Sequence, residues 1–405
     1  MSEEINIPKH WQIKTLGEVC VFSQGIQVDV THQSLEKNKD QVRFLRIIDF
    51  TQGDDPYRYI DNPGGRYYIK KDDIAMVRYG TVGFVCTGKE GIIANNLFKI
   101  EPDEKISKKF LIHFLQSELF RRKLETKGAT MQALSFGLIK PIQIPIPPLP
   151  EQQAIVSKIE ELLSDLENGK QQLQIAQQQL KIYRQSLLKW AFQGKLTNKH
   201  FKDGELPKGW KWKEIREITS VLGDGLHGTP KYSETGEYFF INGNNLSDGK
   251  IEIKENTKCV SVEEYEKYKK PLNERTIFVS INGSLGYTAF YSNEKVILGK
   301  SACYFNVIDS IDKHYIRYFI TSNTFTSYAN KNATGSTIKN VGLKTMREFK
   351  VPIPPTLEEQ QLIVDELESK LTVCDKIEET ISQSLLQAES LRQSILKKAF
   401  SGELV

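Results

Sequence analysis

The sequence predicts an α+β fold built from one unit that occurs twice, because two long helical segments are copies of each other. The segment P-P-L-P-E-Q-Q at residues 147–153 returns as P-P-T-L-E-E-Q-Q at residues 354–361. The helix ends A-F-Q-G-K-L (191–196) and A-F-S-G-E-L (399–404) match at the same offset, since 360 − 152 = 208 and 400 − 192 = 208. A constant offset between two anchors this far apart indicates a duplication.

The duplication also covers the parts of the chain that precede each helix. P-K-H-W at residues 8–11 is echoed by P-K-G-W at residues 207–210, at an offset of 199. Each lead-in opens a region of short β-branched and aromatic runs divided by glycines, with one or two helices, such as the one expected over residues 108–125. This pattern predicts an α+β domain. The predicted domains are a globular region at 1–146, a long helix at 147–200, a second globular region at 201–353 and a second long helix at 354–405.

The first helical segment has the periodicity of a coiled coil. Steps of four and three residues from Ile155 to Trp190 meet an apolar side chain at every position except Gly169. Gly194 and Gly402 lie where a C-terminal helix cap is expected. A helix of about 43 residues is roughly 65 Å long. The second segment keeps the pattern less strictly and is predicted to pack against the first; the alternative is two independent core helices.

Composition excludes several classes of protein. The chain has 405 residues, 39% of them hydrophobic, and a net charge of only +4. No run of 18 apolar residues is present, and the N-terminus lacks the basic and apolar parts of a signal peptide. The five cysteines are scattered and never spaced as C-x-x-C, which favours a reducing cytoplasm and no structural zinc site. None of the six histidines forms an H-x-x-x-H pair, so no metal site is expected.

The duplicated arrangement favours recognition of duplex DNA. An internal repeat can place its halves about a pseudo-two-fold axis, as a homodimer does. Duplex DNA suits that symmetry, and two readers that differ in sequence should read two different half-sites. The mild positive charge is compatible with nucleic acid without requiring it.

The doubled helix signature, the two lead-ins and the loop D-G-L-H-G-T-P at residues 224–230 resemble the specificity subunits of type I restriction-modification systems. The resemblance covers essentially the whole chain. It implies two target recognition domains in pseudo-two-fold arrangement, each reading one half of a bipartite, asymmetric DNA site. It also implies that the two long helices form an antiparallel coiled coil, which sets the gap and docks two methylase subunits. S-adenosylmethionine, ATP and magnesium would then belong to the methylase and the ATP-dependent restriction/translocase subunits, with no cofactor in this chain.

No catalytic site is expected in this chain. Neither an N-P-P-Y nor a D-P-P-Y tetrapeptide is present, so the amino-methyltransferase motif is missing. The sequence G-K-S at residues 299–301 lacks the earlier glycine of a phosphate-binding loop, because position 294 is Glu294. Glu252 and Lys254 could form half of a nuclease metal site, although short E-x-K matches are common. Two alternatives therefore stay open: a stand-alone nuclease with its own readers, and a coiled-coil adaptor that binds proteins.

Basic, amide and aromatic side chains of the predicted reader loops are the candidates for DNA contact, because arginine or lysine can pair with guanine and asparagine or glutamine with adenine. For each of them a solvated surface position is the alternative. The candidates are Gln24, Gln27, Arg43, Arg46, Arg66, Lys70, Arg78 and Tyr79 in the first region, and His227, Lys231, Tyr232, Asn242, Asn244, Asn245, Lys254, Asn282 and Lys300 in the second. The candidates for docking a partner subunit are the helix-end residues Gln152, Gln153, Phe192, Gln360, Gln361 and Phe400, with packing within the coiled coil as the alternative.

Overall fold

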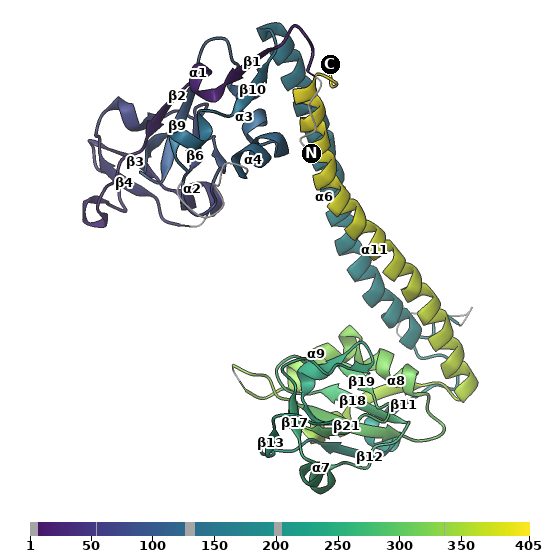
Figure 1. Cartoon of the computed structure of the whole chain (residues 1–405). Helices are drawn as coiled ribbons and strands as arrows, with labels where there is room; N and C mark the ends of the chain where they lie inside the picture. Colours follow the sequence, from purple (N-terminus) through teal and green to yellow (C-terminus); the bar gives the residue numbers. More distant parts are fainter. Residues whose placement is uncertain (1–6, 54, 126–133, 198–204, 336) are drawn as a thin grey trace. The chain divides into compact units, whose positions relative to one another are not determined.

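The computed structural model describes residues 7–53, 55–125, 134–197, 205–335 and 337–405 (Figure 1). The chain forms two compact units. Unit 1 comprises residues 1–174 and 382–405, and unit 2 comprises residues 175–381. Each unit therefore combines one globular region with one part of each long helix, α6 (Leu149–Phe192) and α11 (Leu357–Ser401).

The globular region of unit 1 contains two four-stranded sheets. The antiparallel sheet has the order β2-β9-β6-β7, and the mixed sheet has the order β4-β3-β8-β5, in which β3 and β8 are parallel. A separate antiparallel pair, β1 with β10, joins the start of the chain to the strand that leads into α6. The strands are β1 (Gln12–Thr15), β2 (Cys20–Gln24), β3 (Gln41–Leu45), β4 (Arg58–Asp61), β5 (Tyr68–Ile69), β6 (Ile74–Val77), β7 (Val85–Cys86), β8 (Gly91–Ile93), β9 (Leu97–Pro102) and β10 (Gln143–Ile146).

The helices of this region are α1 (Leu16–Val19), α2 (Ile47–Thr51), α3 (Lys108–Leu115), α4 (Glu118–Glu125) and α5 (Phe136–Ile139). The single helix predicted over residues 108–125 is thus two helices. Ser117 divides them, because its hydroxyl donates to the Phe114 carbonyl (2.6 Å) and accepts from the Phe120 N–H (3.3 Å). A serine that bonds nearby backbone groups competes with the helical hydrogen bonds.

Unit 2 repeats the antiparallel sheet, with the order β12-β21-β18-β19. Its mixed sheet has the order β13-β17-β14-β20 and keeps the parallel pair, since β14 pairs with β20 as β3 pairs with β8, but its outer strand lies on the other side of that pair. The strands are β11 (Lys211–Glu214), β12 (Thr219–Asp224), β13 (Tyr232–Ser233), β14 (Tyr238–Ile241), β15 (Leu246–Ser247), β16 (Lys250–Ile251), β17 (Lys258–Val260), β18 (Thr276–Ser280), β19 (Thr288–Phe290), β20 (Val296–Leu298), β21 (Ala302–Val307) and β22 (Lys350–Ile353). The helices are α7 (Val262–Tyr268), α8 (Lys313–Ile320), α9 (Asn323–Asn332) and α10 (Leu343–Glu348).

The two long helices pack against each other within each unit, as predicted. In unit 1, Ile155 and Ile159 at the start of α6 share one core with Ile395 and Ala399 at the end of α11. In unit 2, the core contains Leu180 and Leu187 of α6 with Leu367 and Cys374 of α11. The pairing is antiparallel in each unit, because the start of one helix meets the end of the other (Figure 1).

The glycines at the helix ends have the conformation expected of caps. Gly194 and Gly402 have φ values of +76° and +77°. A Cβ at Gly194 would lie 2.2 Å from Cγ of Pro207, and one at Gly402 would lie 2.3 Å from Cγ of Pro8. Both glycines are therefore required by backbone conformation and by close contact with the lead-in of their own unit. Within the described part of the chain, no helix has the length and apolar character needed to cross a bilayer.

Candidate nucleic-acid interface

The globular region of each unit docks onto the long helices through the same set of contacts. The indole of Trp11 donates to Glu151 (2.9 Å) in unit 1, and that of Trp210 donates to Glu359 (2.8 Å) in unit 2. Phe400 packs between Phe110 and Phe114, with ring centroids 5.1 and 5.4 Å away. Phe192 meets Tyr315 and Phe319 in the same way, at 5.1 and 4.8 Å.

Two buried glutamines complete this anchoring. The side-chain Oε1 of Gln152 accepts from the Ser107 N–H (2.9 Å), and its NH2 donates to the backbone carbonyls of Lys105 and Pro147 (both 2.9 Å). The side-chain Oε1 of Gln360 accepts from the Asp312 N–H (2.9 Å), and its NH2 donates to the backbone carbonyl of Ser310 (3.2 Å). Buried polar groups that are satisfied in this way hold one geometry.

The docking assignment made from the sequence is therefore wrong for four of its six residues. Gln152, Phe192, Gln360 and Phe400 are buried inside their own units and have no surface to offer to a partner subunit. The duplicated pattern P-x-L-x-E-Q-Q therefore reflects internal anchoring at its first glutamine. Gln153 and Gln361 are exposed, so docking by these two stays a prediction.

In each unit, the chain that leaves the first strand of the antiparallel sheet, β2 or β12, crosses to the end of a strand in the mixed sheet, β8 or β20. We call this segment the backbone crossing. The N–H groups of Gly25 and Ile26 donate to the carbonyls of Leu97 and Ile93 (both 3.0 Å). In unit 2, the N–H groups of Gly225 and Leu226 donate to the carbonyls of Ala302 (3.2 Å) and Leu298 (2.7 Å). A Cβ on either glycine would lie 2.2 Å from the carbonyl oxygen of the residue that follows β8 or β20, Ala94 or Gly299, so only glycine permits the crossing.

In unit 1 this crossing brings four predicted DNA contacts together around Asn95. The Gln24 side chain donates to the backbone carbonyl of Asn95 (3.4 Å), and the Asn95 NH2 donates to the side-chain Oε1 of Gln27 (3.1 Å). Arg78 donates to the carbonyls of Asn95 (3.5 Å) and Leu134 (3.1 Å), and its guanidinium lies 5.3 Å from the centre of the exposed Tyr79 ring. We call Gln24, Gln27, Asn95, Arg78 and Tyr79 edge 1.

In unit 2 the equivalent edge has different chemistry. His227 pairs with Asp224 (2.5 Å between Nε2 and Oδ2), and the exposed Lys300 is tied to the same turn by its backbone N–H, which donates to the Leu226 carbonyl (3.0 Å). Asn282 donates to Asn340 (3.2 Å) and lies beside the same loop, because its own N–H donates to the Ser301 carbonyl (3.3 Å). We call Asp224, His227, Lys300, Ser301 and Asn282 edge 2.

A polar hollow of about 570 Å³ adjoins edge 2. Ser301 links the two, because its hydroxyl donates to the side-chain Oδ1 of Asn242 (3.0 Å) and accepts from the Gly243 N–H (2.8 Å). The side chain of Lys254 closes one side by donating to the Asn244 carbonyl (2.6 Å). The hollow thus gathers four predicted DNA contacts, and its polar lining includes Asn242, Asn244, Glu252, Lys254, Asn282, Ser284, Tyr287 and Ser301.

Asn245 does not belong to this surface, and its assignment as a DNA contact is wrong. The residue is only 5% exposed. Its side-chain Oδ1 accepts from the Asn242 N–H (3.0 Å), and its NH2 donates to the backbone carbonyl of Glu252 (2.9 Å) and to the Thr257 hydroxyl (3.1 Å). Its polar atoms are therefore all used to hold a turn, and no donor or acceptor faces solvent.

The remaining predicted contacts lie outside the two edges. Arg43 and Arg46 both pair with the buried Asp49, at 3.4 and 3.1 Å, and Arg46 also pairs with Asp55 (2.6 Å). Arg43 in addition lies 3.7 Å from the centre of the Tyr57 ring. These arginines hold the turn after β3, so base contact by them stays a prediction. Four further candidates are exposed and stay predictions as well: Arg66, Lys70, Lys231 and Tyr232.

Sequence reasoning missed Asn95, Asp224 and Ser301. A signal for the first was present, because the Asn-Asn pair at 95–96 divides an apolar run and is typical of a turn. Asp224 could have been found from its place in the loop at 224–230. Ser301 carried no local signal, since its role depends on a contact with Asn242, 59 residues away.

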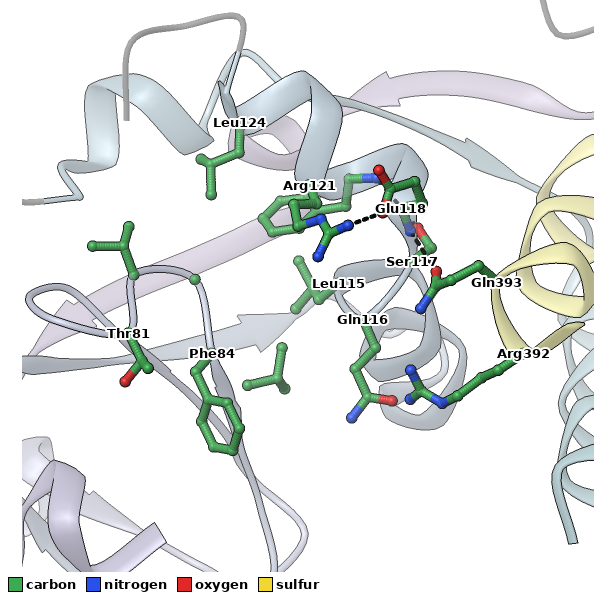
Figure 2. A pocket seen from close by; sticks show the side chains of 14 residues that line it. Thr81, Phe84, Leu115, Gln116, Ser117, Glu118, Arg121, Leu124, Arg392 and Gln393 are labelled. Carbon is green, nitrogen blue, oxygen red and sulfur yellow. Dashed lines mark hydrogen bonds and ion pairs between the residues drawn. The ribbon is translucent and has the colours of Figure 1, made fainter. Parts of the chain in front are cut away.

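A second hollow, of about 430 Å³, lies entirely within unit 1 (Figure 2). It is bounded by the turn between β6 and β7, by the junction of α3 and α4, and by α11. Gln393 of α11 accepts from the Glu118 N–H (2.9 Å), and Glu118 also pairs with Arg121. The lining combines apolar side chains, such as those of Phe84, Leu115 and Leu124, with the charged side chains of Glu118, Arg121 and Arg392.

No group of three or more potential metal ligands occurs among the described residues of either unit. Burial raises the pKa of the thiols of Cys20, Cys86 and Cys303 to about 12, so none of these is a thiolate nucleophile near neutral pH. Glu252 and Lys254 are exposed and 4.0 Å apart, as in an ordinary surface ion pair.

Comparison with curated proteins finds relatives along almost the whole chain. The specificity subunit of the type I restriction enzyme EcoBI from Escherichia coli is 26% identical over 417 residues, covering 99% of this chain and 87% of the relative. The EcoKI specificity subunit from E. coli K12 is 27% identical and covers 75% of this chain and 67% of the relative. The MjaVIII specificity subunit from Methanocaldococcus jannaschii is 21% identical, with coverage of 99% and 94%.

Solved structures share the fold. A chain from a study of complex assembly and conformational transition of the type I R-M system has a TM-score of 0.73 at 19% identity, covering 98% of this chain and 99% of that one. The HsdS subunit from Thermoanaerobacter tengcongensis has a TM-score of 0.62 at 19% identity and covers 99% of both chains. The family model for the type I restriction modification DNA specificity domain matches residues 8–177 and again residues 207–387. The chain therefore belongs to the type I restriction modification DNA specificity family.

Proposed function

We propose that this chain is the DNA-recognition subunit of a type I restriction-modification complex and is not itself an enzyme. One observation carries the proposal: two domains of one architecture, anchored by the same contacts, present edges with different hydrogen-bonding groups. Each unit then reads one half of a bipartite, asymmetric site through side chains that reach base edges. The family membership and the named relatives support this assignment.

Equivalent exposed residues support docking of two methylase subunits. Leu149 and Gln153 lie one turn apart at the start of α6, and Leu357 and Gln361 repeat this pair at the start of α11. Leu149 is 41% exposed and Leu357 is 42% exposed. Leu357 and Gln361 also line a hollow of about 380 Å³. Two copies of one partner subunit would need two equivalent docking surfaces, and each unit offers one such pair of residues.

The remaining parts of the proposal concern the whole complex. S-adenosylmethionine would bind to the methylase subunits, and ATP and magnesium to the restriction/translocase subunits, in the cytoplasm. The long helices would set the number of unread base pairs between the half-sites. The catalytic steps would then belong to those partners, and this chain would decide where on DNA they act.

Adenine methylation mapped across the host genome, with and without this gene, tests the function. The expected result is the loss of one asymmetric, two-part motif when the gene is deleted. An unchanged methylation map, together with no methylase co-purifying with the chain, would remove the proposal. The stand-alone nuclease predicts metal-dependent cleavage of DNA by the purified chain, and the adaptor predicts no sequence preference on duplex DNA.

A further inference from the structure

The backbone crossing at Gly25 and Gly225 gives a residue-by-residue alignment of the two edges. Gln24 pairs with Phe98 across the sheet, and Asp224 pairs with Cys303 in the equivalent register. The bridges Ile26 with Ala94 and Leu226 with Gly299 continue the same match. Position 24 therefore corresponds to 224, position 27 to 227 and position 95 to 300. This alignment depends on backbone hydrogen bonds and not on sequence similarity.

The three aligned positions have different chemistry in the two units. In unit 1 they are the amide residues Gln24, Gln27 and Asn95. The Gln24 NH2 donates to the backbone carbonyl of Asn95, and the Asn95 NH2 donates to the side-chain oxygen of Gln27. In unit 2 they are Asp224, His227 and Lys300, which are all titratable or charged. The side chain of His227 is 73% exposed and that of Asp224 is 30% exposed, and Lys300 is exposed. We call the two sets the amide triplet and the charged triplet.

The surroundings indicate that the triplets are not needed to hold the fold. The crossing itself is made by backbone groups of Gly25, Ile26, Gly225 and Leu226. No buried side chain depends on the hydrogen bonds within either triplet, because those bonds are between exposed or half-exposed groups. The duplicated fold thus keeps the backbone at these positions and leaves the side chains free to differ.

We propose, on the basis of the function proposed above, that the two triplets are the base-reading positions of the two units. An amide side chain offers one donor and one acceptor in the geometry of the adenine major-groove edge. Lysine and a protonated or donor histidine match the guanine acceptors, and an aspartate accepts from the cytosine amino group. The amide triplet therefore reads an A·T pair in the half-site of unit 1, and the charged triplet reads a G·C pair in the half-site of unit 2.

Exchange of the triplets tests this assignment in the complex of the full chain with its methylase subunits. One variant carries Asp224→Gln, His227→Gln and Lys300→Asn, and the other carries Gln24→Asp, Gln27→His and Asn95→Lys. The methylated motif is read by genome-wide adenine mapping, and binding is measured on duplexes of the wild-type motif and of single-base replacements. Lys300→Asn alone serves as a milder variant, and Lys344→Asn, an exposed lysine on α10, is the matched control.

The first variant should replace one G·C pair by A·T in one half of the motif and leave the other half unchanged. Methylation and binding of the wild-type site should fall by about five- to 150-fold, the discrimination of one bidentate base contact. The second variant should change the opposite half, and Lys344→Asn should change neither.

Variants that still assemble with the methylase and keep the wild-type motif would overturn the proposal. Equal weakening on every sequence would also overturn it, because the triplets would then contact only phosphates. A wild-type complex that methylates no bipartite motif would instead refute the function on which the proposal rests.

Discussion

The turns that follow β3 in unit 1 and β14 in unit 2 have one backbone and two chemistries. Asp49 accepts from the Arg46 N–H (2.9 Å), and Asn245 accepts from the Asn242 N–H (3.0 Å) at the equivalent place. In unit 1 the buried carboxylate draws Arg43 and Arg46 into ion pairs. In unit 2 the neutral amide binds only uncharged groups, and the surface beside it is open as a polar hollow.

The contacts that hold each unit to the long helices do not differ in this way. Tryptophan to glutamate, glutamine to backbone, and aromatic ring to phenylalanine all recur at equivalent positions. A buried contact requires complementary partners on both sides, so it changes only if both sides change together. An exposed edge has no such constraint. The comparison teaches that the anchoring must be shared while the reading surfaces can diverge.

The largest expected effect is loss of the aromatic anchors. Phe400→Ala in unit 1 and Phe192→Ala in unit 2 should each lower the free energy of unfolding of the affected unit by about 3–5 kcal/mol, because a large buried ring is removed. Hydrogen exchange followed separately in α3 and α8 would locate each effect. Destabilisation by only one of the two substitutions would show that the two phenylalanines are not equivalent anchors.

The buried glutamines should show a smaller and unequal effect. Gln152→Ala leaves three backbone partners without a bond and Gln360→Ala leaves two, at a cost of about 1–3 kcal/mol for each unsatisfied group that stays dry. Denaturant unfolding should therefore show the larger loss for Gln152. The exposed neighbours Gln153→Ala and Gln361→Ala are the controls and should be close to wild type. Equal losses would mean that water replaces some of the lost bonds.

The exposed leucines at the helix starts should each affect one partner subunit. Leu149→Asp and Leu357→Asp should each weaken the binding of one methylase copy by about tenfold, the loss typical of one apolar interface residue. Mass measurement of the assembled complex at limiting concentration would show one methylase instead of two. Val30→Asp, at a residue that is 68% exposed in unit 1, is the control. Retention of both copies in both variants would place the docking surface elsewhere.

The smallest expected effect is a dependence of stability on pH, which helix α3 should give to unit 1 and helix α8 should not give to unit 2. Burial lowers the pKa of His113 from its usual 6.5, helped by Arg392 and Lys109 and opposed by Glu160. The equivalent position in α8 is Tyr318. His113 takes up a proton more readily in the unfolded chain than in the folded one, so a fall in pH favours unfolding. The contribution of neutral His113 to the stability of unit 1 is therefore fully present above pH 6.5 and is lost as the pH falls below it. Thermal unfolding between pH 7.5 and 5.5 should show this dependence in the wild type and less of it in His113→Phe. The same slope in both proteins would exclude His113 as its source.

Much of the architecture could be predicted because it depends on local and repetitive signals. The period of apolar residues from Ile155 to Trp190 predicted α6, and the constant offset of 208 predicted its pairing with a copy. The break at Ser117 was missed, since a serine within an apolar helical pattern is compatible with either outcome. Among site residues, Gln24, Gln27, His227, Asn282 and Lys300 were chosen for side-chain chemistry, and the structure brings them to the two edges.

The sequence by itself determined the duplication and the two long helices, because repeats and periodicity are visible along one dimension. Its motifs, by their resemblance to known proteins, also indicated a DNA-specificity family. The tertiary structure decided which polar residues are exposed. Gln152 and Gln153 are neighbours of the same type, yet only the first turns toward Ser107 and is buried. Gln393 meets a helix start 275 residues away, and Asn95 meets Gln27 across 68 residues. Such contacts depend on how strands and helices assemble in three dimensions, and no local pattern encodes them.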